Sequence, residues 1–315
     1  MEVRKVNGFF IIFVIGYIGL SVVCASIMAY AQNSGIAVPD WIQYVMSEGI
    51  ILLIAIIYMI VQKIDPIREI PYKRIGIVDV ILSLVAGYCL IPAVLLISNL
   101  SMLFSTNYLE EGTTTLLTYP FAMQVILLAV IPPLVEELIF RGIFFGSYRK
   151  AGMTGAALMS GLLFGCFHLN INQALYAFVM GIVFAYMVEA TGSLWSSVIA
   201  HFAVNTYSIG IVQILKMAGM YAQDGSVSET FENAESVAGQ STSITVVQIA
   251  MIAVIAAVFM MLAVLCIRTM AKRHGNLEKM KIQNVKLSHI KNYFTAPVIV
   301  GIVVLYVPPF IEYSN

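Results

Sequence analysis

Long uninterrupted apolar runs recur along almost the whole chain, and they constrain its fold more than any other feature. Most hold about 18 to 25 residues, the length that an α-helix needs to cross a bilayer. Strands of a membrane barrel would be shorter and would alternate in polarity. The runs cover residues 8–30, 43–61, 76–98, 117–146, 154–169, 174–190, 194–215, 244–267 and 294–311. They predict an all-α, polytopic transmembrane bundle of about eight to nine helices.

Composition supports this fold class. Only 11% of the residues are charged and 60% are hydrophobic, whereas a soluble domain is roughly one quarter charged. The 17 Lys and Arg residues are balanced by 17 Asp and Glu residues and are scattered along the chain, so the sequence does not indicate a basic surface for binding nucleic acid. No stretch suits a separate soluble domain. We therefore expect residues 1–315 to form a single integral-membrane domain.

Two of the runs are short for a full span. Residues 154–169 and 174–190 are separated only by Asn170, Ile171, Asn172 and Gln173. The pair is compatible with a tight helical hairpin or with one partly re-entrant element.

The positions of the basic residues predict the orientation, because Lys and Arg near span ends stay on the cytoplasmic side. With the amino terminus inside, nine spans place 15 of the 17 cations on that side. The two exceptions are Lys216, at a helix end, and Arg141, within an apolar run. We therefore expect a cytoplasmic amino terminus.

Three charged residues stand deep in the fourth run, where an ionisable group is costly and is by default a functional hypothesis. Glu137 and Arg141 are four residues apart, which predicts an ion pair on one helix face. Glu136 lies about 100° around the helix, so we expect its carboxylate to face a different space. The alternative is that all three form one packing network. Pro132 and Pro133 predict a kink or a helix restart just before the acids.

Two histidines lie in later apolar runs. Phe164 precedes His168 by one helical turn, and Asn205 follows His201 by one turn, so each pair shares a helix face. At about 1.5 Å per residue, Glu136 and His168 each lie roughly 20 Å from the inner boundary. His201 and Asn205 lie roughly 12 Å and 18 Å from it. The four polar groups therefore fall in one layer, which predicts a single site.

A carboxylate, two imidazoles and an amide in a wet pocket suit hydrolysis of an amide bond. Glu136 is the candidate general base on water, and His168 would orient that water. His201 and Asn205 would donate to the tetrahedral oxyanion. Alternatively, Glu136, His168 and His201 would bind a divalent metal such as Zn²⁺ with an open position for water. The chain has no His-Glu-x-x-His motif.

Three motifs follow one another on successive apolar runs: Glu136-Glu137-x-x-x-Arg141, Phe164-x-x-x-His168 and His201-x-x-x-Asn205. In this order they resemble the motifs of the CPBP (ABI) intramembrane proteases, which include type II CAAX prenyl endopeptidases and bacteriocin-processing or immunity proteins. The resemblance places a catalytic core at about residues 115–215.

The resemblance implies an intramembrane endopeptidase that cleaves a membrane-associated peptide or protein. By resemblance, Glu136 is the catalytic glutamate and His168 holds the water. The remaining roles implied are an oxyanion-side pair, His201 and Asn205, and the supporting residues Glu137, Arg141 and Phe164. The family has been described both as metal-dependent and as glutamate-dependent. We favour a glutamate mechanism without a bound cofactor, because these side chains suffice for hydrolysis.

The expected partners are membrane lipid and a membrane-associated substrate, with substrate lipidation left open, and the expected location is a bacterial cell membrane. Two other functions fit the same residues. In a proton-coupled transporter or channel, the charged groups and histidines would form a relay, and the prolines would interrupt a helix. In a non-catalytic immunity-type membrane protein, the network would serve stability alone.

Overall fold

The computed structural model describes residues 3–103, 119–219, 246–282 and 291–312, and its regular structure within these ranges is entirely helical. Seven helical segments in this part of the chain are long and apolar enough to cross a membrane. They are α1 (Val3–Asn33), α2 (Trp41–Val61), α4 (Ile77–Ser101), the segment Phe121–Ala151, α10 (Ile171–Thr191), α11 (Trp195–Met217) and α13 (Val246–Arg273). Two shorter apolar helices, α9 (Met153–Phe167) and α15 (Ala296–Glu312), account for the other two predicted runs. The chain is an all-α integral membrane protein.

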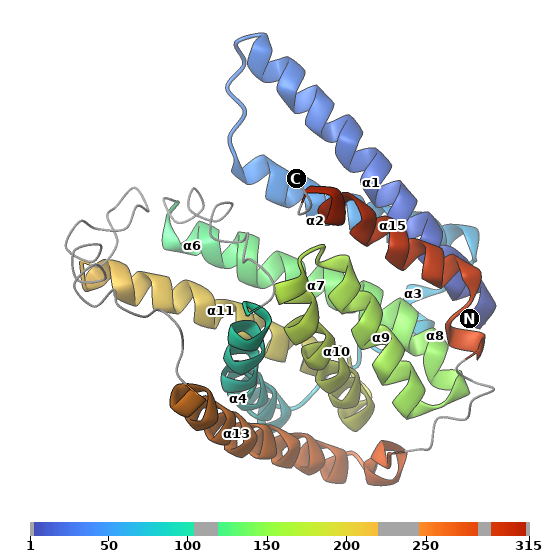
Figure 1. Cartoon of the computed structure of the whole chain (residues 1–315). Helices are drawn as coiled ribbons and strands as arrows, with labels where there is room; N and C mark the ends of the chain where they lie inside the picture. The colour runs from blue at the N-terminus through green and yellow to red at the C-terminus, as the bar shows by residue number, and fades with distance from the viewer. Residues whose placement is uncertain (1–2, 104–118, 220–245, 283–290, 313–315) are drawn as a thin grey trace.

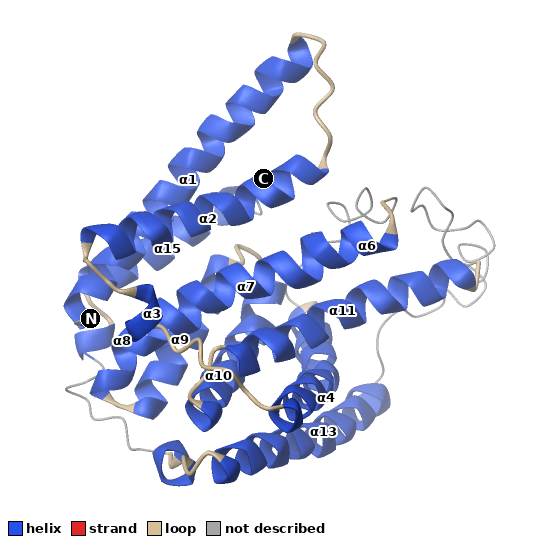
Figure 2. Ribbon diagram, turned by 180° about the vertical axis from the view of Figure 1, so that it is seen from behind, coloured by secondary structure: helices blue, strands red, loops and turns tan. Residues whose placement is uncertain are grey.

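The helices form three neighbouring groups (Figures 1 and 2). Helices α2 and α15 both pack against α1. Helices α11 and α13 both pack against α4. The fourth span and the α9–α10 pair lie between these two groups. The aromatic cluster of Phe10, Phe13, Phe140 and Phe144 fills the core on the α1 side, so the middle group is held by apolar contacts with its neighbours.

The basic segments gather on one side of the bundle. Figure 1 shows the amino terminus, α3 (Pro66–Glu69), α8 (Gly146–Tyr148) and the carboxyl end of α13 on that side. Lys73, Arg149 and Lys279, which are far apart in the sequence, line one pocket there. This arrangement agrees with the alternation of spans deduced from the charges. Which side faces the cytoplasm stays a prediction.

The fourth span is a continuous but irregular helix. It runs through α6 (Phe121–Gln124), the π-helix η2 (Val125–Val130), α7 (Ile131–Glu137), the π-helix η3 (Leu138–Phe145) and α8. Pro132 and Pro133 lie in the first turn of α7, where a missing backbone N–H is tolerated. The chain therefore winds more loosely on both sides of the prolines instead of breaking. Wide turns of this kind are frequent at functional sites.

Helices α9 and α10 form the tight hairpin, the first of the two predicted alternatives. Helix α9 ends at Phe167, and Leu169 adopts a left-handed conformation with φ of 58°. The side chain of Asn170 then caps α10 by accepting a hydrogen bond of 2.9 Å from the Asn172 amide. The two backbones approach closely, because a Cβ atom added at Gly165 would lie 2.5 Å from the Ala174 carbonyl oxygen. The hairpin fixes the position of His168 at its tip.

Candidate active site

Glu137 and Arg141 form a fully buried ion pair in the fourth span. Nη1 of Arg141 lies 2.9 Å from Oε1 of Glu137, and neither side chain is exposed. The guanidinium carbon also lies 4.2 Å from the ring centre of Phe164 and 5.2 Å from that of Phe184. Opposite charge and the negative ring faces together offset part of the cost of burying the cation. The structure confirms the predicted pair and adds two aromatic partners to it.

His201, on α11, lies between the two adjacent glutamates. Its Nδ1 is 3.1 Å from Oε1 of Glu137, and its Nε2 is 3.6 Å from Oε2 of Glu136. Because a carboxylate accepts hydrogen bonds, the Nδ1 proton is donated to Glu137. The two carboxylates approach different nitrogens of one imidazole because α11 packs against α7, so Glu136 and Glu137 lie on different sides of the His201 ring. Glu136 differs in access: its side chain is 15% exposed.

His168 follows the last turn of α9 and is oriented by that turn. Its Nδ1 lies 2.8 Å from the carbonyl oxygen of Phe164, and its ring meets the Phe164 ring edge-on at 4.7 Å between centres. A carbonyl oxygen only accepts, so Nδ1 carries the proton. In the neutral ring, Nε2 is then a hydrogen-bond acceptor. The predicted Phe164–His168 contact is confirmed, and it fixes the tautomer as well as the position of the ring.

Asn205 binds the backbone of the fourth span. Its Nδ2 donates a hydrogen bond of 2.8 Å to the carbonyl oxygen of Leu128. In an α-helix this carbonyl would accept a hydrogen bond from residue 132, and in a π-helix from residue 133. Both residues are proline and have no backbone N–H to donate. Asn205 therefore replaces a hydrogen bond that the prolines remove, and it ties α11 to the irregular span.

Ring contacts and ion pairs together join most of the predicted residues into one cluster. Phe164 lies 5.7 Å from the His201 ring, centre to centre, in addition to its contact with His168. The cluster thus consists of Glu136, Glu137, Arg141, Phe164, His168 and His201. Asn205 stands one helical turn beyond His201 and contacts the backbone of the same span. A residue of α10 also takes part, since the Phe184 ring lies 5.2 Å from the His201 ring, centre to centre, at a tilt of 31°.

Sequence reasoning missed a third carboxylate, Glu48 on α2. Helix α2 packs against α7, and Glu48 interacts electrostatically with Glu136. Its Oε2 atom is buried without a hydrogen-bond partner among the described residues. The signal was present in the sequence, because Glu48 is an ionisable residue inside the apolar run 43–61. Its approach to Glu136 depends on how α2 packs.

A metal needs three or more convergent protein ligands in a catalytic zinc site. Within the described parts of the chain, no three His, Cys, Asp or Glu side chains are grouped in that way. Nδ1 of His201 is engaged by Glu137 and Nδ1 of His168 by the Phe164 carbonyl, which leaves the Nε2 atom of each ring for a ligand. Whether Glu136, His168 and His201 hold a metal stays a prediction.

Comparisons with known proteins select the same region. Residues 118–207 match the family model described as type II CAAX prenyl endopeptidase Rce1-like. A Bacillus subtilis (strain 168) protein named Putative membrane peptidase YdiL is 33% identical over 88 residues. That alignment covers 28% of this chain and 36% of the relative, so the chain spans little more than a third of the protein it matches. No solved structure matches significantly.

The matched segment contains every residue predicted for the site: Glu136, Glu137, Arg141, Phe164, His168, His201 and Asn205. The bacterial relative agrees with the expected location in a bacterial membrane. Three ordered motifs, their convergence in the structure and the family match point the same way: the segment 118–207 of this membrane protein is similar to the Rce1-like, or CPBP, family.

Proposed function

We propose that the protein is a membrane peptidase that hydrolyses a peptide bond in a membrane-associated peptide or protein. The observation that carries this proposal is the partly accessible Glu136 beside a buried Glu137–His201–Arg141 network. The description of the matching family and the printed name of the relative support it. A hydrolase of this kind needs a base for water, a donor for the oxyanion and a fixed geometry.

In this mechanism Glu136 is the general base. A water molecule between Glu136 and His168 gives one proton to the Glu136 carboxylate while its oxygen attacks the peptide carbonyl carbon. Nε2 of His168 accepts a hydrogen bond from the other hydrogen of the water, because its Nδ1 proton is engaged by the Phe164 carbonyl. Glu136 suits this role better than Glu137, whose carboxylate is fully buried against Arg141.

The oxyanion receives its hydrogen bond from His201 in the imidazolium form, through Nε2–H. Glu137 accepts the hydrogen bond from Nδ1 of His201, and Arg141 pairs with Glu137. Asn205 uses one Nδ2 hydrogen on Leu128, and the second is the other donor to the oxyanion. Glu136 then returns its proton to the leaving nitrogen as the carbon–nitrogen bond breaks, which completes hydrolysis.

The first prediction tests Glu136. Purified full-length protein in lipid nanodiscs is incubated with a mass-spectrometric library of apolar peptides, and new peptide termini are quantified. We expect Glu136→Gln to reduce cleavage by at least about 100-fold, since the amide cannot take the proton from water. Its thermal unfolding should remain close to that of the wild type, because Glu136 has no hydrogen bond among the described residues and lies 3.6 Å from His201.

Glu278→Gln is the matched control, because the Glu278 side chain is 81% exposed and the chemical change is identical. This control should cleave like the wild type. A chelator arm, with metal analysis of the same sample, should leave wild-type cleavage unchanged. Full activity of Glu136→Gln would exclude the glutamate mechanism, and loss of activity on chelation with recovery on zinc addition would favour the metal alternative.

A further inference from the structure

A large polar pocket lies among the basic ends of the spans. Its volume is about 1060 Å³, and it is formed where the chain around residues 69–73, 149–153, 188–192 and 274–279 meets. Six basic residues line it: Lys73, Arg141, Arg149, Lys150, His274 and Lys279. Two acidic residues, Glu69 and Glu189, also line it. With histidine neutral, the lining carries five positive and two negative charges.

Internal pairing leaves two lysines for a ligand. Both oxygens of Glu189 accept from the guanidinium of Arg149, and Lys279 donates to the side-chain oxygen of Asn276 at 2.8 Å. Lys73 and Lys150 are exposed, and neither ammonium pairs with a carboxylate in the described part of the chain. Arg141 lines the same pocket, and its Nε and Nη2 atoms are buried without a hydrogen-bond partner among the described residues. Excess positive charge therefore remains.

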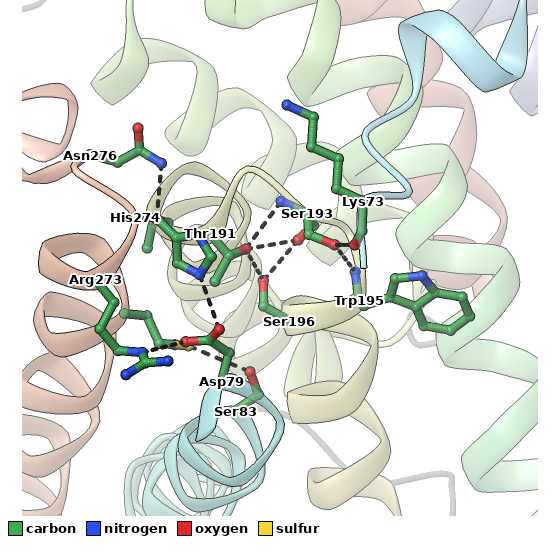
Figure 3. Close-up of polar contacts among 12 residues, drawn as sticks. Lys73, Asp79, Ser83, Thr191, Ser193, Trp195, Ser196, Arg273, His274 and Asn276 are labelled. Carbon is green, nitrogen blue, oxygen red and sulfur yellow. Dashed lines mark hydrogen bonds and ion pairs between the residues drawn. The ribbon is translucent and has the colours of Figure 1, made fainter. Parts of the chain in front are cut away.

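The backbone around the pocket is held in place before any ligand arrives. Figure 3 shows Ser193 donating to the carbonyl of Lys73, and the Leu194 amide donates to Pro71 at 2.8 Å. These bonds join the segment before α4 to the α10–α11 turn. The Lys73 ammonium points away from the hydrogen bonds drawn there. A lysine on a fixed backbone loses less freedom on binding than one on a loose loop.

Residues of the 277–280 turn (η5) also line a second pocket of about 560 Å³, between α10 and α13. Leu277 and Met280 line it together with Met260, Ala263 and Ile267, so it is mostly apolar. Asn276 and Lys279, in the same short stretch, line the polar pocket. A polar, cationic pocket and an apolar groove thus share one wall. This pairing fits a phosphate group that carries an acyl chain better than it fits free phosphate.

We propose that the pocket lined by Lys73 and Lys150 binds the phosphate of an anionic membrane phospholipid, with an acyl chain along the neighbouring apolar groove. Basic pockets at the cytoplasmic ends of transmembrane helices are suited to anionic headgroups, and each nearby Lys or Arg contributes to the attraction. Arg141 connects this pocket to the candidate active site through its ion pair with Glu137. The binding itself requires no peptidase activity, so it is testable if the proposed function fails.

The experiment measures lipid binding to delipidated full-length protein by native mass spectrometry and by thermal unfolding. Dioleoyl phosphatidylglycerol is compared with zwitterionic dioleoyl phosphatidylcholine, and separate arms contain sodium phosphate or glycerol 3-phosphate. We expect phosphatidylglycerol to bind more tightly and to raise the unfolding temperature. The double variant Lys73→Gln/Lys150→Gln should lose on the order of 30-fold in affinity for phosphatidylglycerol, at about a fivefold loss per lysine.

The matched control is Lys5→Gln/Lys272→Gln, which removes two exposed lysines that do not line the pocket. It should bind phosphatidylglycerol like the wild type, and both double variants should unfold at the wild-type temperature without lipid. Saturable binding of phosphate alone, lost only in the pocket variant, would keep the phosphate site but assign it to a free anion. Equal binding of the two lipids, or equal losses in both double variants, would overturn the proposal.

Discussion

At the scale of single residues, buried charge dominates the energetics of the candidate site. Glu137 and Arg141 are both fully buried, whereas the pair Asp65 and Arg68 lies on the surface. A buried ion pair gains little over apolar residues, but removal of one partner leaves an uncompensated charge in a low-dielectric interior. Exposed pairs are screened by water and contribute little. The same chemistry therefore has different consequences at the two places.

The second prediction compares these pairs. Arg141→Ala should destabilise the protein by about 3 to 5 kcal/mol, because Glu137 keeps its charge without its guanidinium partner. Arg68→Ala should change stability by less than about 1 kcal/mol, because its side chain is 85% exposed. Both are measured by reversible unfolding in detergent. An Arg141→Ala protein that is as stable as the wild type but inactive would assign the pair to chemistry and not to stability.

The third prediction concerns Glu48. A buried carboxylate near a second carboxylate costs more free energy than a neutral amide at the same place, so Glu48→Gln should stabilise the protein by about 1 to 3 kcal/mol. Because Glu48 interacts electrostatically with Glu136, the pH–rate profile of peptide cleavage should also differ from that of the wild type. Glu278→Gln should alter neither property. Lower stability of Glu48→Gln with an unchanged profile would show that the carboxylate has a local structural partner.

At the scale of elements, close backbone contact positions the residues of the candidate site. The hairpin of α9 and α10 depends on glycines, because a Cβ at Gly161 would lie 2.7 Å from the Phe178 carbonyl oxygen and one at Gly165 would be closer still to Ala174. Small residues at four-residue spacing permit such contacts between membrane helices. His168 follows Gly165 by three residues, so the hairpin spacing also sets the place of its ring.

The fourth prediction tests this dependence. Gly165→Ala should destabilise the protein by about 1 to 3 kcal/mol through overpacking, and a shift of His168 by about 1 Å should lower cleavage by about 10- to 100-fold. Gly210→Ala, on α11, is the control, because an added Cβ there meets no atom within 4 Å. Cleavage and unfolding are measured on the same preparations. Normal activity of Gly165→Ala would mean that His168 does not require this contact.

Hydropathy predicts where a span begins and ends, but it does not predict how regularly the helix is wound. The run 174–190 is observed as Ile171–Thr191 and the run 154–169 as Met153–Phe167, since hydropathy marks span ends well. The π-helical turns around α7 were not predicted, because one extra residue per turn leaves the apolar composition unchanged. The prolines explain why Asn205 bonds to Leu128, but only the packing of α11 against this span brings the amide to that carbonyl.

At the scale of the whole molecule, the distribution of charge gives the fifth prediction. Because Lys and Arg are retained on the cytoplasmic side, Lys272 should lie inside and the turn at Ser34 outside. Single cysteines are introduced at these two positions after Cys24, Cys89, Cys166 and Cys266 are replaced by alanine. A membrane-impermeant maleimide should label Ser34→Cys on intact cells and Lys272→Cys only after permeabilisation. The reverse pattern would invert the topology.

The sequence alone determined the membrane-spanning helical class and the span positions, and it predicted most polar residues of the candidate site. These follow from local properties: the length of apolar runs and the high cost of an ionisable group such as Glu136 within one. Tertiary structure decided that His201 lies between Glu136 and Glu137, that Phe164 and Phe184 cover Arg141, and that Glu48 joins the site. Those relations depend on the rotation and depth of packed helices, and lipid-facing and buried apolar residues look alike in a sequence.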